Sequence, residues 1–313
     1  MLSAEPAAAV LWCIEDARPG HRNQLRGLLR RIEAVAPVHV HTIAIQSRAV
    51  AWWRWLTGRF PEGKDLPDPD LILGAGHGTH PAVLAARRAR GGRAVILMRP
   101  SLPVRWFDLC LVPEHDGLRA GENIILTRGA INTVVPSGQQ AADRGLILLG
   151  GPSSHHGWDD AAMVGQVRAV VTAEPGRKWK LTTSRRTPAD IVPALRALPA
   201  DNLEVIPVDQ TEPGWVGREL EQASAVWVSE DSVSMVYEAL TSGAAVGVLA
   251  VPRRGTGRVV RGLDQLVSEG WVTTFDAWQE GQALQPPPTP LFEADRCARI
   301  ICERWLCPRG GCR

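Results

Sequence analysis

Residues 229–249 read SEDSVSMVYEALTSGAAVGVL, and this stretch decides the fold because it holds a complete strand–helix–strand connection. A strand ends near Ser229, a short helix covers residues 232–242, Gly243 stops the helix, and the apolar run 245–249 forms the next strand. The first turn of a helix exposes unpaired N–H groups at the positive end of its dipole. The stretch therefore predicts an α/β sheet with a place for an anion such as a phosphate.

The side chains of this helix match a nucleotide-sugar site. Ser232 and Ser234 stand at its opening turn, and Glu238 lies one turn further along. A carboxylate at that place can reach a sugar hydroxyl while the start of the helix holds a diphosphate. The alternative is structural: Asp231 or Ser232 caps a core helix, a role that is compatible with binding.

Strands alternate with helices through the whole chain. Apolar strands are predicted at 8–14, 38–45, 71–73, 94–98, 109–112, 145–149, 178–183, 203–208, 225–228, 245–249 and 272–274. Helices are predicted between them at 24–35, 81–90, 160–173, 188–197, 217–223, 232–242 and 262–269, with a last one at 292–305. Such alternation indicates parallel sheets covered on both faces, which bind ligands at the carboxyl ends of their strands.

The pattern restarts near residue 145, after the polar connector 134–140. We therefore predict a Rossmann-like acceptor-side domain at 1–140, a Rossmann-like nucleotide-sugar-side domain at 141–290, and a C-terminal helix and tail at 291–313. Two Rossmann-like α/β domains with parallel sheets, facing across a cleft and joined by a C-terminal crossover helix, describe the GT-B architecture.

Composition excludes several classes of function. The 313 residues carry a net charge of +2, which gives no support for nucleic-acid binding. No apolar run approaches a membrane span, and the first ten residues lack the basic start of a signal peptide, so the cytoplasm is the expected location. The four C-terminal cysteines recur every five residues without a C-x-x-C pair, so we interpret them as helix and tail cysteines, with a metal site or a disulfide in the tail as the alternative. No Asp-x-Asp ends a strand, so we expect neither a metal nor a cofactor besides the substrate.

A polar loop follows the first predicted strand. Residues 15–24 read EDARPGHRNQ, in which Pro-Gly fixes a turn and the charged side chains exceed what a turn needs. We interpret the loop as an acceptor site, with Asp16 or His21 as the general base. The alternative is an ordinary helix start capped by Asn23.

A glycine-rich loop, GAGHGTHP at 74–81, follows the third strand. Small residues let a ligand approach the backbone, and Thr79 can cap the next helix. A tight strand–helix turn explains the glycines equally well. His77 is the additional feature, and we place it near the transferred sugar; its alternative is a buried, hydrogen-bonded histidine.

Residues 150–159, GGPSSHHGWD, follow the first strand of the second domain. Gly150, Gly151 and Ser153 are candidates to contact a phosphate or a sugar. The adjacent histidines do not favour a metal, because neighbouring side chains diverge. Asp159 can cap the following helix.

Residues 182–188, TTSRRTP, follow the next strand. Ser184, Arg185 and Arg186 are candidates to bind a leaving diphosphate, because guanidinium groups contact phosphate oxygens in pairs. The alternative is a solvated basic turn.

Trp52, Trp53 and Trp55 form an aromatic cluster with Arg54 after the second strand. The cluster suits peripheral contact with a membrane interface, here the inner membrane, or with an apolar acceptor. Packing of the two domains or a protein partner is the alternative.

Together these motifs resemble the bacterial relatives of the plant mitochondrial fission protein called elongated mitochondria. The resemblance spans roughly residues 10–250 and implies a GT-B fold. Plant members are described as adaptors that recruit a dynamin-type protein to mitochondria, and this composition looks bacterial. The resemblance is carried by five motifs: D-x-R-P-G-H-x-N-Q from Asp16, G-A-G-H-x-T from Gly74, G-G-x-S from Gly150, S-R-R-T-P from Ser184 and E-D-S-V-S-M from Glu230.

The leading hypothesis is a metal-independent glycosyltransferase that uses a nucleotide-diphosphate sugar and a glycan or lipid-linked acceptor. Looser analogy to transferases of this fold assigns Glu238 to the ribose or the sugar. Two alternatives stay open: a non-catalytic adaptor on the same scaffold, with the tryptophan cluster as its contact, and a sugar-nucleotide epimerase.

Overall fold

The computed structural model describes residues 8–45, 47–255, 257–289 and 291–307. Most of the N-terminal segment considered as a signal peptide lies outside these residues. The chain divides into two compact units, which are Met1–Thr133 with Glu293–Arg313, and Val134–Phe292. The boundary between the units falls after Thr133, seven residues before the expected boundary at residue 140. The C-terminal helix belongs to the first unit.

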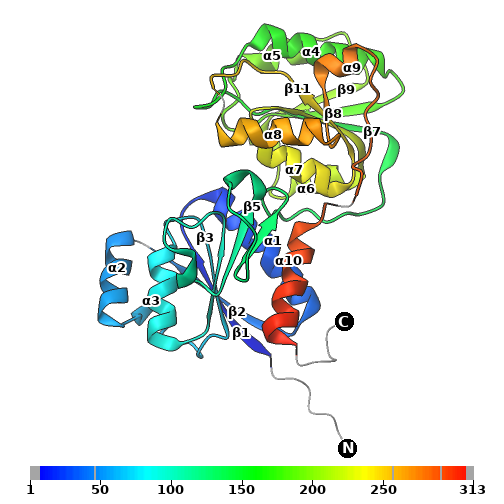
Figure 1. Ribbon diagram of the computed structural model, residues 1–313. Helices are drawn as coiled ribbons and strands as arrows, with labels where there is room; N and C mark the ends of the chain where they lie inside the picture. Colours follow the sequence, from blue (N-terminus) through cyan, green and yellow to red (C-terminus); the bar gives the residue numbers. More distant parts are fainter. Residues whose placement is uncertain (1–7, 46, 256, 290, 308–313) are drawn as a thin grey trace, which may run out of the picture. The chain divides into compact units, whose positions relative to one another are not determined.

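The first unit contains a six-stranded parallel sheet in the order β2-β1-β3-β4-β5-β6 (Figure 1). The order reverses direction beside β1, so the loops after β1 and β3 lie at the same edge of the sheet. The strands are β1 (Ala9–Glu15), β2 (Val38–Ala44), β3 (Leu71–Ala75), β4 (Arg93–Leu97), β5 (Leu109–Pro113) and β6 (Ile124–Thr127).

Helices cover both faces of this sheet. α1 (Pro19–Val35) packs beside α10 (Glu293–Ile301) on one face, and α2 (Arg48–Thr57) packs beside α3 (His80–Arg90) on the other (Figure 1). An ion pair between Arg31 and Asp295, 2.6 Å apart, joins α1 to α10. The chain thus returns from the second unit to complete the first.

The second unit repeats the design, with the parallel order β12-β11-β10-β7-β8-β9. This order brings the carboxyl ends of β7, β8 and β10 side by side. The strands are β7 (Ala141–Leu148), β8 (Lys178–Thr182), β9 (Leu203–Ile206), β10 (Ala223–Ser229), β11 (Ala245–Leu249) and β12 (Thr273–Thr274).

Two hydrophobic layers enclose this second sheet (Figure 1). One layer holds α6 (Trp215–Gln222), α7 (Val233–Ser242) and α8 (Arg258–Ser268). The other holds α4 (Asp160–Ala173), α5 (Ile191–Arg196) and α9 (Phe275–Gln279). The predicted fold class, α/β with two parallel sheets of the GT-B type, is confirmed.

Most predicted elements are present, α4 with the predicted bounds. The sequence reading missed β6, α2 and α9. β6 is short and α9 is a single turn, so neither shows a periodic pattern. α2 was missed because tryptophans are weak helix formers and its apolar residues do not all face the core.

In the core of the second unit, two large tryptophan side chains each occupy the space left by a glycine on the neighbouring strand. Trp179 on β8 lies beside Gly145 on β7, and Trp227 on β10 lies beside Gly247 on β11. A Cβ on either glycine would come within 2.4 Å of the neighbouring indole ring. Both indoles are fully buried, so the glycines supply the volume that the rings occupy.

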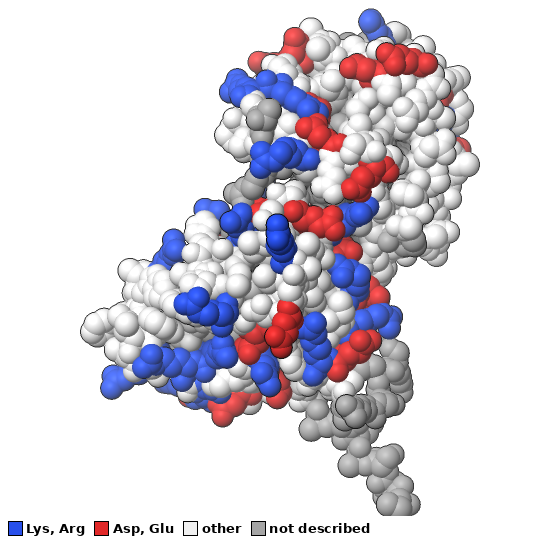
Figure 2. Space-filling model, viewed as in Figure 1, with Lys and Arg blue, Asp and Glu red and all other residues white. Residues whose placement is uncertain are grey.

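Charges of both signs are distributed over each unit on the face shown in Figure 2. None of the helices in the described part of the chain has the length and apolar character to cross a bilayer.

Candidate functional site

The loop after β1 is shorter than the sequence suggested, because α1 begins at Pro19 and not at residue 24. Proline tolerates the first helical turn, where its missing N–H would have no partner. His21 therefore lies in the first turn of α1, and Asp16 lies in the loop before it. Asn23 is inside the helix and does not cap it.

Asp16 and His21 form a dyad. The Nδ1 atom of His21 lies 2.8 Å from Oδ2 of Asp16, and the two side chains are 10% and 15% exposed. The other carboxylate oxygen, Oδ1, accepts a hydrogen bond from the Arg18 amide. The aspartate therefore fixes the orientation of the ring and favours the tautomer that carries its proton on Nδ1.

The second ring nitrogen of His21 remains available. Nε2 forms no hydrogen bond with any described residue, and it is not sealed from solvent. A histidine whose Nδ1–H is held by a carboxylate presents a basic lone pair at Nε2, which is the arrangement used for proton abstraction.

The glycine loop after β3 packs directly against this dyad. Gly76 has a φ of +75°, and a Cβ on it would lie 2.1 Å from the His21 ring. A Cβ on Gly78 would lie 3.3 Å from Asp16. The loop is therefore glycine-rich because it forms one wall of the dyad.

The two other polar side chains of this loop behave differently from the expectation. His77 is exposed and contacts no described residue in a hydrogen bond, so its predicted place near a transferred sugar stays a prediction. Thr79 was expected to cap α3, but its hydroxyl makes no capping bond and donates to the carbonyl of Gly76 instead.

His80 is fully buried at the start of α3, where its ring meets Phe107 edge-on at 5.3 Å. Its Nε2 has no hydrogen-bond partner, and burial, with the nearby His77, lowers its pKa to about 4. The ring is therefore neutral in the folded protein at pH values where an unfolded histidine is already charged.

We expect this histidine to make the protein sensitive to acid. The pKa of His80 is lower in the folded state than in the unfolded state, so protonation favours unfolding. The free energy of unfolding is therefore unaffected by His80 above pH 6.5 and falls by up to about 3 kcal/mol as the pH drops toward 4. Urea unfolding of wild type and His80→Phe at several pH values measures the effect. Between pH 6.5 and pH 4 the unfolding free energy of the variant should fall less than that of wild type. If both fall equally with pH, His80 is not the group responsible.

In the second unit, the loops after β7, β8 and β10 meet at Asp231. The Asp231 carboxylate is fully buried and accepts hydrogen bonds from four donors. These donors are the Gly151 amide (2.9 Å), the Ser229 hydroxyl (2.7 Å), the Ser232 hydroxyl (3.2 Å) and Nη2 of Arg186 (2.8 Å). Asp231 is thus more than a helix cap, because it joins three strand ends into one structure.

Gly150 and Gly151 are packed into this junction. The Gly150 amide donates to the Ser229 hydroxyl at 2.7 Å, as the Gly151 amide does to Asp231. A Cβ on Gly150 would lie 2.1 Å from Asp231, and one on Gly151 would lie 2.3 Å from a backbone oxygen of Arg186. The glycines permit this close approach, and a contact of theirs with a ligand stays a prediction.

The three predicted polar side chains of the adjoining loops split into two kinds. Arg186 donates to the carbonyl of Gly151 (2.7 Å) and pairs with Asp231, so its guanidinium fastens loops together. Ser184 donates to the carbonyl of Gly150 at 2.8 Å. Arg185 is exposed and pairs with no described residue. Of the two arginines in this loop, it is therefore the one whose positive charge is open to a ligand.

The start of α7 has two amides without an acceptor in the described part of the chain. The Ser232 amide donates to Ser229, and the amides of Met235 and Val236 donate to Ser232. The amides of Val233 and Ser234 find no acceptor among the described residues, and Ser234 is exposed. The helix start therefore offers two N–H groups at its positive end.

Other predicted contacts in this unit have local functions. The Ser153 hydroxyl accepts bonds from the amides of His155 and His156 and shapes its own loop. Asp159 caps α4 by accepting from the Ala162 amide, as predicted. Ser232 is 5% exposed and Glu238 is partly exposed on α7, and their binding of a donor stays a prediction.

Sequence reasoning missed an ion pair next to this junction, between the buried Glu230 and the exposed Arg253. Glu230 accepts two hydrogen bonds from Arg253, at 3.0 and 3.1 Å, and these raise the Arg253 pKa above its usual range. His156 lies close by, 1% exposed, and burial lowers its pKa. The two partners are 23 residues apart in the sequence, and no local pattern signals the pair.

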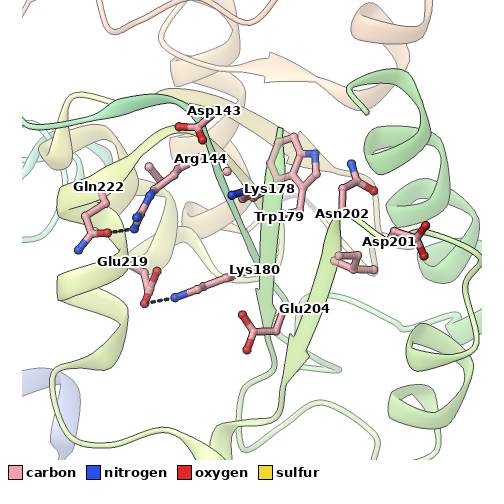
Figure 3. A pocket seen from close by; sticks show the side chains of 13 residues that line it. Asp143, Arg144, Lys178, Trp179, Lys180, Asp201, Asn202, Glu204, Glu219 and Gln222 are labelled. Atoms are coloured by element: carbon pink, nitrogen blue, oxygen red, sulfur yellow. Dashed lines mark hydrogen bonds and ion pairs between the residues drawn. The ribbon is translucent and has the colours of Figure 1, made fainter. Parts of the chain in front are cut away.

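A pocket of about 400 Å³ lies at the opposite edge of this sheet (Figure 3). It is lined by residues at the amino ends of β7, β8 and β9, and Lys180 points to Glu219 at 2.8 Å within it. Ligands of parallel α/β sheets bind at the carboxyl ends, so this pocket is not the predicted site. Within the described ranges, no group of three His, Cys, Asp or Glu residues is placed to hold a metal ion.

The comparison with protein families decides the affiliation of the chain. The model of the family described as mitochondrial fission ELM1 matches residues 19–305. The chain belongs to the mitochondrial fission ELM1 family. The family match covers the Asp16–His21 loop from Pro19 onward and every loop of the Asp231 junction. Among curated proteins, no sequence matches this member of the ELM1 family significantly.

Several solved structures with the same fold are described as UDP-N-acetylglucosamine 2-epimerases or as glycosyltransferases. The putative UDP-N-acetylglucosamine 2-epimerase of Listeria monocytogenes has a TM-score of 0.62 at 14% identity, covering 95% of this chain and 97% of its own. The UDP-GlcNAc 2-epimerase of Neisseria meningitidis, bound to UDP-GlcNAc, has a TM-score of 0.57 at 12% identity, with coverages of 95% and 99%.

A glycotransferase of kitacinnamycin has a TM-score of 0.54 at 15% identity, covering 96% of this chain and all of its own. At these identities the likeness establishes the fold alone. This ELM1-family chain therefore has a GT-B fold, which both glycosyltransferases and epimerases share.

Proposed function

We propose that this protein is a metal-independent glycosyltransferase that transfers a sugar from a nucleotide-diphosphate donor to an acceptor hydroxyl. The observation that carries the proposal is the Asp16–His21 dyad, with its 2.8 Å hydrogen bond and its unpaired Nε2. An adaptor surface needs no such base, whereas a histidine that a carboxylate orients is the arrangement expected at a site of acid–base chemistry.

The first unit supplies the base. Nε2 of His21 takes the proton of the acceptor hydroxyl, and Asp16 stabilises the imidazolium that forms. The acceptor oxygen then forms a bond to the anomeric carbon. The bond between the anomeric carbon and the diphosphate oxygen breaks, and the nucleoside diphosphate leaves with that electron pair. Direct displacement of this kind inverts the configuration at the anomeric carbon.

The second unit supplies the donor site. The free amides of Val233 and Ser234 and the positive end of α7 face the charge that develops on the leaving diphosphate. Arg185 adds an uncommitted positive charge, and Asp231 keeps the three loops in place. Glu238, further along α7, contacts the ribose or the sugar.

Donor binding tests the proposal directly. Calorimetric titration with UDP-, GDP- and ADP-sugars should reveal binding of at least one of them, whereas the matching nucleoside without phosphate should bind much more weakly. If no nucleotide sugar binds the folded protein, the proposed donor site is wrong.

Arg185→Ala should weaken binding of that donor about tenfold, since one charge-assisted contact to a phosphate is worth roughly 1.5 kcal/mol. The matched control is Arg168→Ala, an exposed arginine on α4, which should leave the affinity unchanged. A loss in both variants would point to a general charge effect and not to a phosphate contact.

An epimerase is the second candidate, because several of the solved structures that share the fold carry that description. Incubation of the donor alone separates the two reactions. An epimerase converts the sugar without an acceptor, whereas a transferase consumes the donor at a useful rate only when an acceptor hydroxyl is supplied.

A further inference from the structure

α2 presents an apolar face that the first unit leaves uncovered. Val50, Trp53 and Leu56, spaced three residues apart, are 43%, 67% and 61% exposed. They are three of the four large hydrophobic residues that are exposed in the described chain, the fourth being Val135 in the other unit. Single exposed hydrophobic residues are ordinary, but three on one helix face form a patch.

The rest of the tryptophan cluster supports this patch from behind. Trp55 stacks on Trp106 with centroids 5.7 Å apart, and Trp52 meets Trp55 edge-on at 5.5 Å. The expected membrane contact of all three tryptophans is thus narrowed to Trp53, because Trp55 packs inside the unit against Trp106 and only Trp53 is exposed. The inner pair anchors α2, so the outer face is held rigidly.

The unpaired charge near this patch is positive. Residues 43–61 contain Arg48, Arg54 and Arg59 but no aspartate or glutamate. Arg54 is paired with Glu62, whereas Arg48, Arg59 and the neighbouring Arg88 on α3 are exposed and form no ion pair with a described residue. In Figure 2, blue atoms flank the white surface at the end of the first unit where Figure 1 draws α2.

We propose that the outer face of α2, formed by Val50, Trp53 and Leu56 with Arg48 and Arg59 near its two ends, docks on an anionic phospholipid bilayer. Tryptophan is favoured at the boundary between headgroups and acyl chains, where its indole has both an apolar and a polar environment. The unpaired guanidinium groups then lie at the level of the lipid phosphates, which they bind well.

A second copy of the chain is a poorer occupant. A symmetric dimer places the same patch against itself, so the unpaired arginines of one copy would face those of the other. Such like-charge contacts oppose association, whereas an anionic surface attracts them. The charge around the patch therefore selects a lipid surface.

Flotation of the full chain with vesicles tests the proposal. The protein should bind vesicles of phosphatidylcholine with about one-third phosphatidylglycerol, bind pure phosphatidylcholine far less, and dissociate as salt is raised. Trp53→Ser with Leu56→Ser should lower the partition coefficient at least tenfold, because both side chains lose their transfer into the interface. Circular dichroism should show that this variant stays folded, since both positions are exposed.

Three further variants complete the test, and two of them, Val135→Ser and Arg168→Gln, are controls. Val135→Ser removes the other exposed hydrophobic residue and should not change binding. Arg59→Gln should weaken binding about fivefold, at roughly 1 kcal/mol for each basic residue near the surface. Arg168→Gln, in the other unit, should have no effect.

The proposal is overturned if anionic vesicles bind no better than neutral ones, or if Val135→Ser costs as much as the double change. It is also overturned if light scattering shows a dimer that the double change dissociates and no vesicle binding occurs, because the occupant is then a second copy. None of these measurements depends on sugar transfer, so the proposed function and the docking surface succeed or fail separately.

Discussion

Replacing His21 with alanine is expected to lower the rate of sugar transfer about a thousandfold, which is the usual contribution of a positioned general base. The loss should appear in kcat, with the affinity for the nucleotide sugar unchanged, because the donor is held by the second unit. Steady-state kinetics with the donor identified by titration measures both quantities.

Asp16→Asn should reproduce a large part of this loss. The amide can still bond to the ring, but it no longer stabilises the charged imidazolium and it changes the favoured tautomer. The double variant should be little worse than His21→Ala alone, since the two side chains act as one unit.

A matched histidine makes the test specific. His39→Ala, at an exposed position on the edge strand β2, should leave transfer intact. Full activity of His21→Ala would eliminate this dyad as the base and with it the central part of the proposed mechanism.

Asp231→Ala is expected to lower the free energy of unfolding by about 3 kcal/mol, because a buried carboxylate that accepts four hydrogen bonds is lost. The change removes the shared acceptor of four donors and leaves the buried Gly151 amide without a partner. Urea denaturation followed by tryptophan fluorescence reports on this unit through Trp179 and Trp227.

Asp264→Ala provides the comparison. Asp264 also pairs with an arginine, at 2.8 Å from Arg253, but its side chain is 50% exposed. Water screens such a pair, so the cost should stay below about 1 kcal/mol. Equal effects of the two changes would show that Asp231 is not the centre of the junction.

The two residues of the first-unit dyad are close in the sequence, whereas the residues of the Asp231 junction are not. Asp16 and His21 are five residues apart, so a turn followed by a helix start is enough to bring them together. The partners of Asp231 are far more distant: Gly151 is 80 residues away and Arg186 is 45. They meet only because β10, β7 and β8 are neighbours in the sheet.

The two arginines of the 182–188 loop show the same limit. Arg185 and Arg186 are adjacent and chemically identical, and the sequence assigned both to a diphosphate. In the structure Arg186 is bound to Asp231 and to loop carbonyls, whereas Arg185 is exposed and unpaired among the described residues. Which of the two arginines is used in a structural ion pair depends on the neighbouring loops, whose residues are far away in the sequence.

The sequence by itself determined the α/β class, most of the strands and helices, and the strand ends at which polar loops gather. Periodicity, glycine stops and polar loops are written within a few residues, so they can be read directly. The tertiary structure alone decided which of those polar groups pair with one another and which have no partner among the described residues, as is the case for Nε2 of His21 and the Val233 and Ser234 amides. The reason is physical: a buried polar group takes whatever partner the strand order brings within about 3 Å.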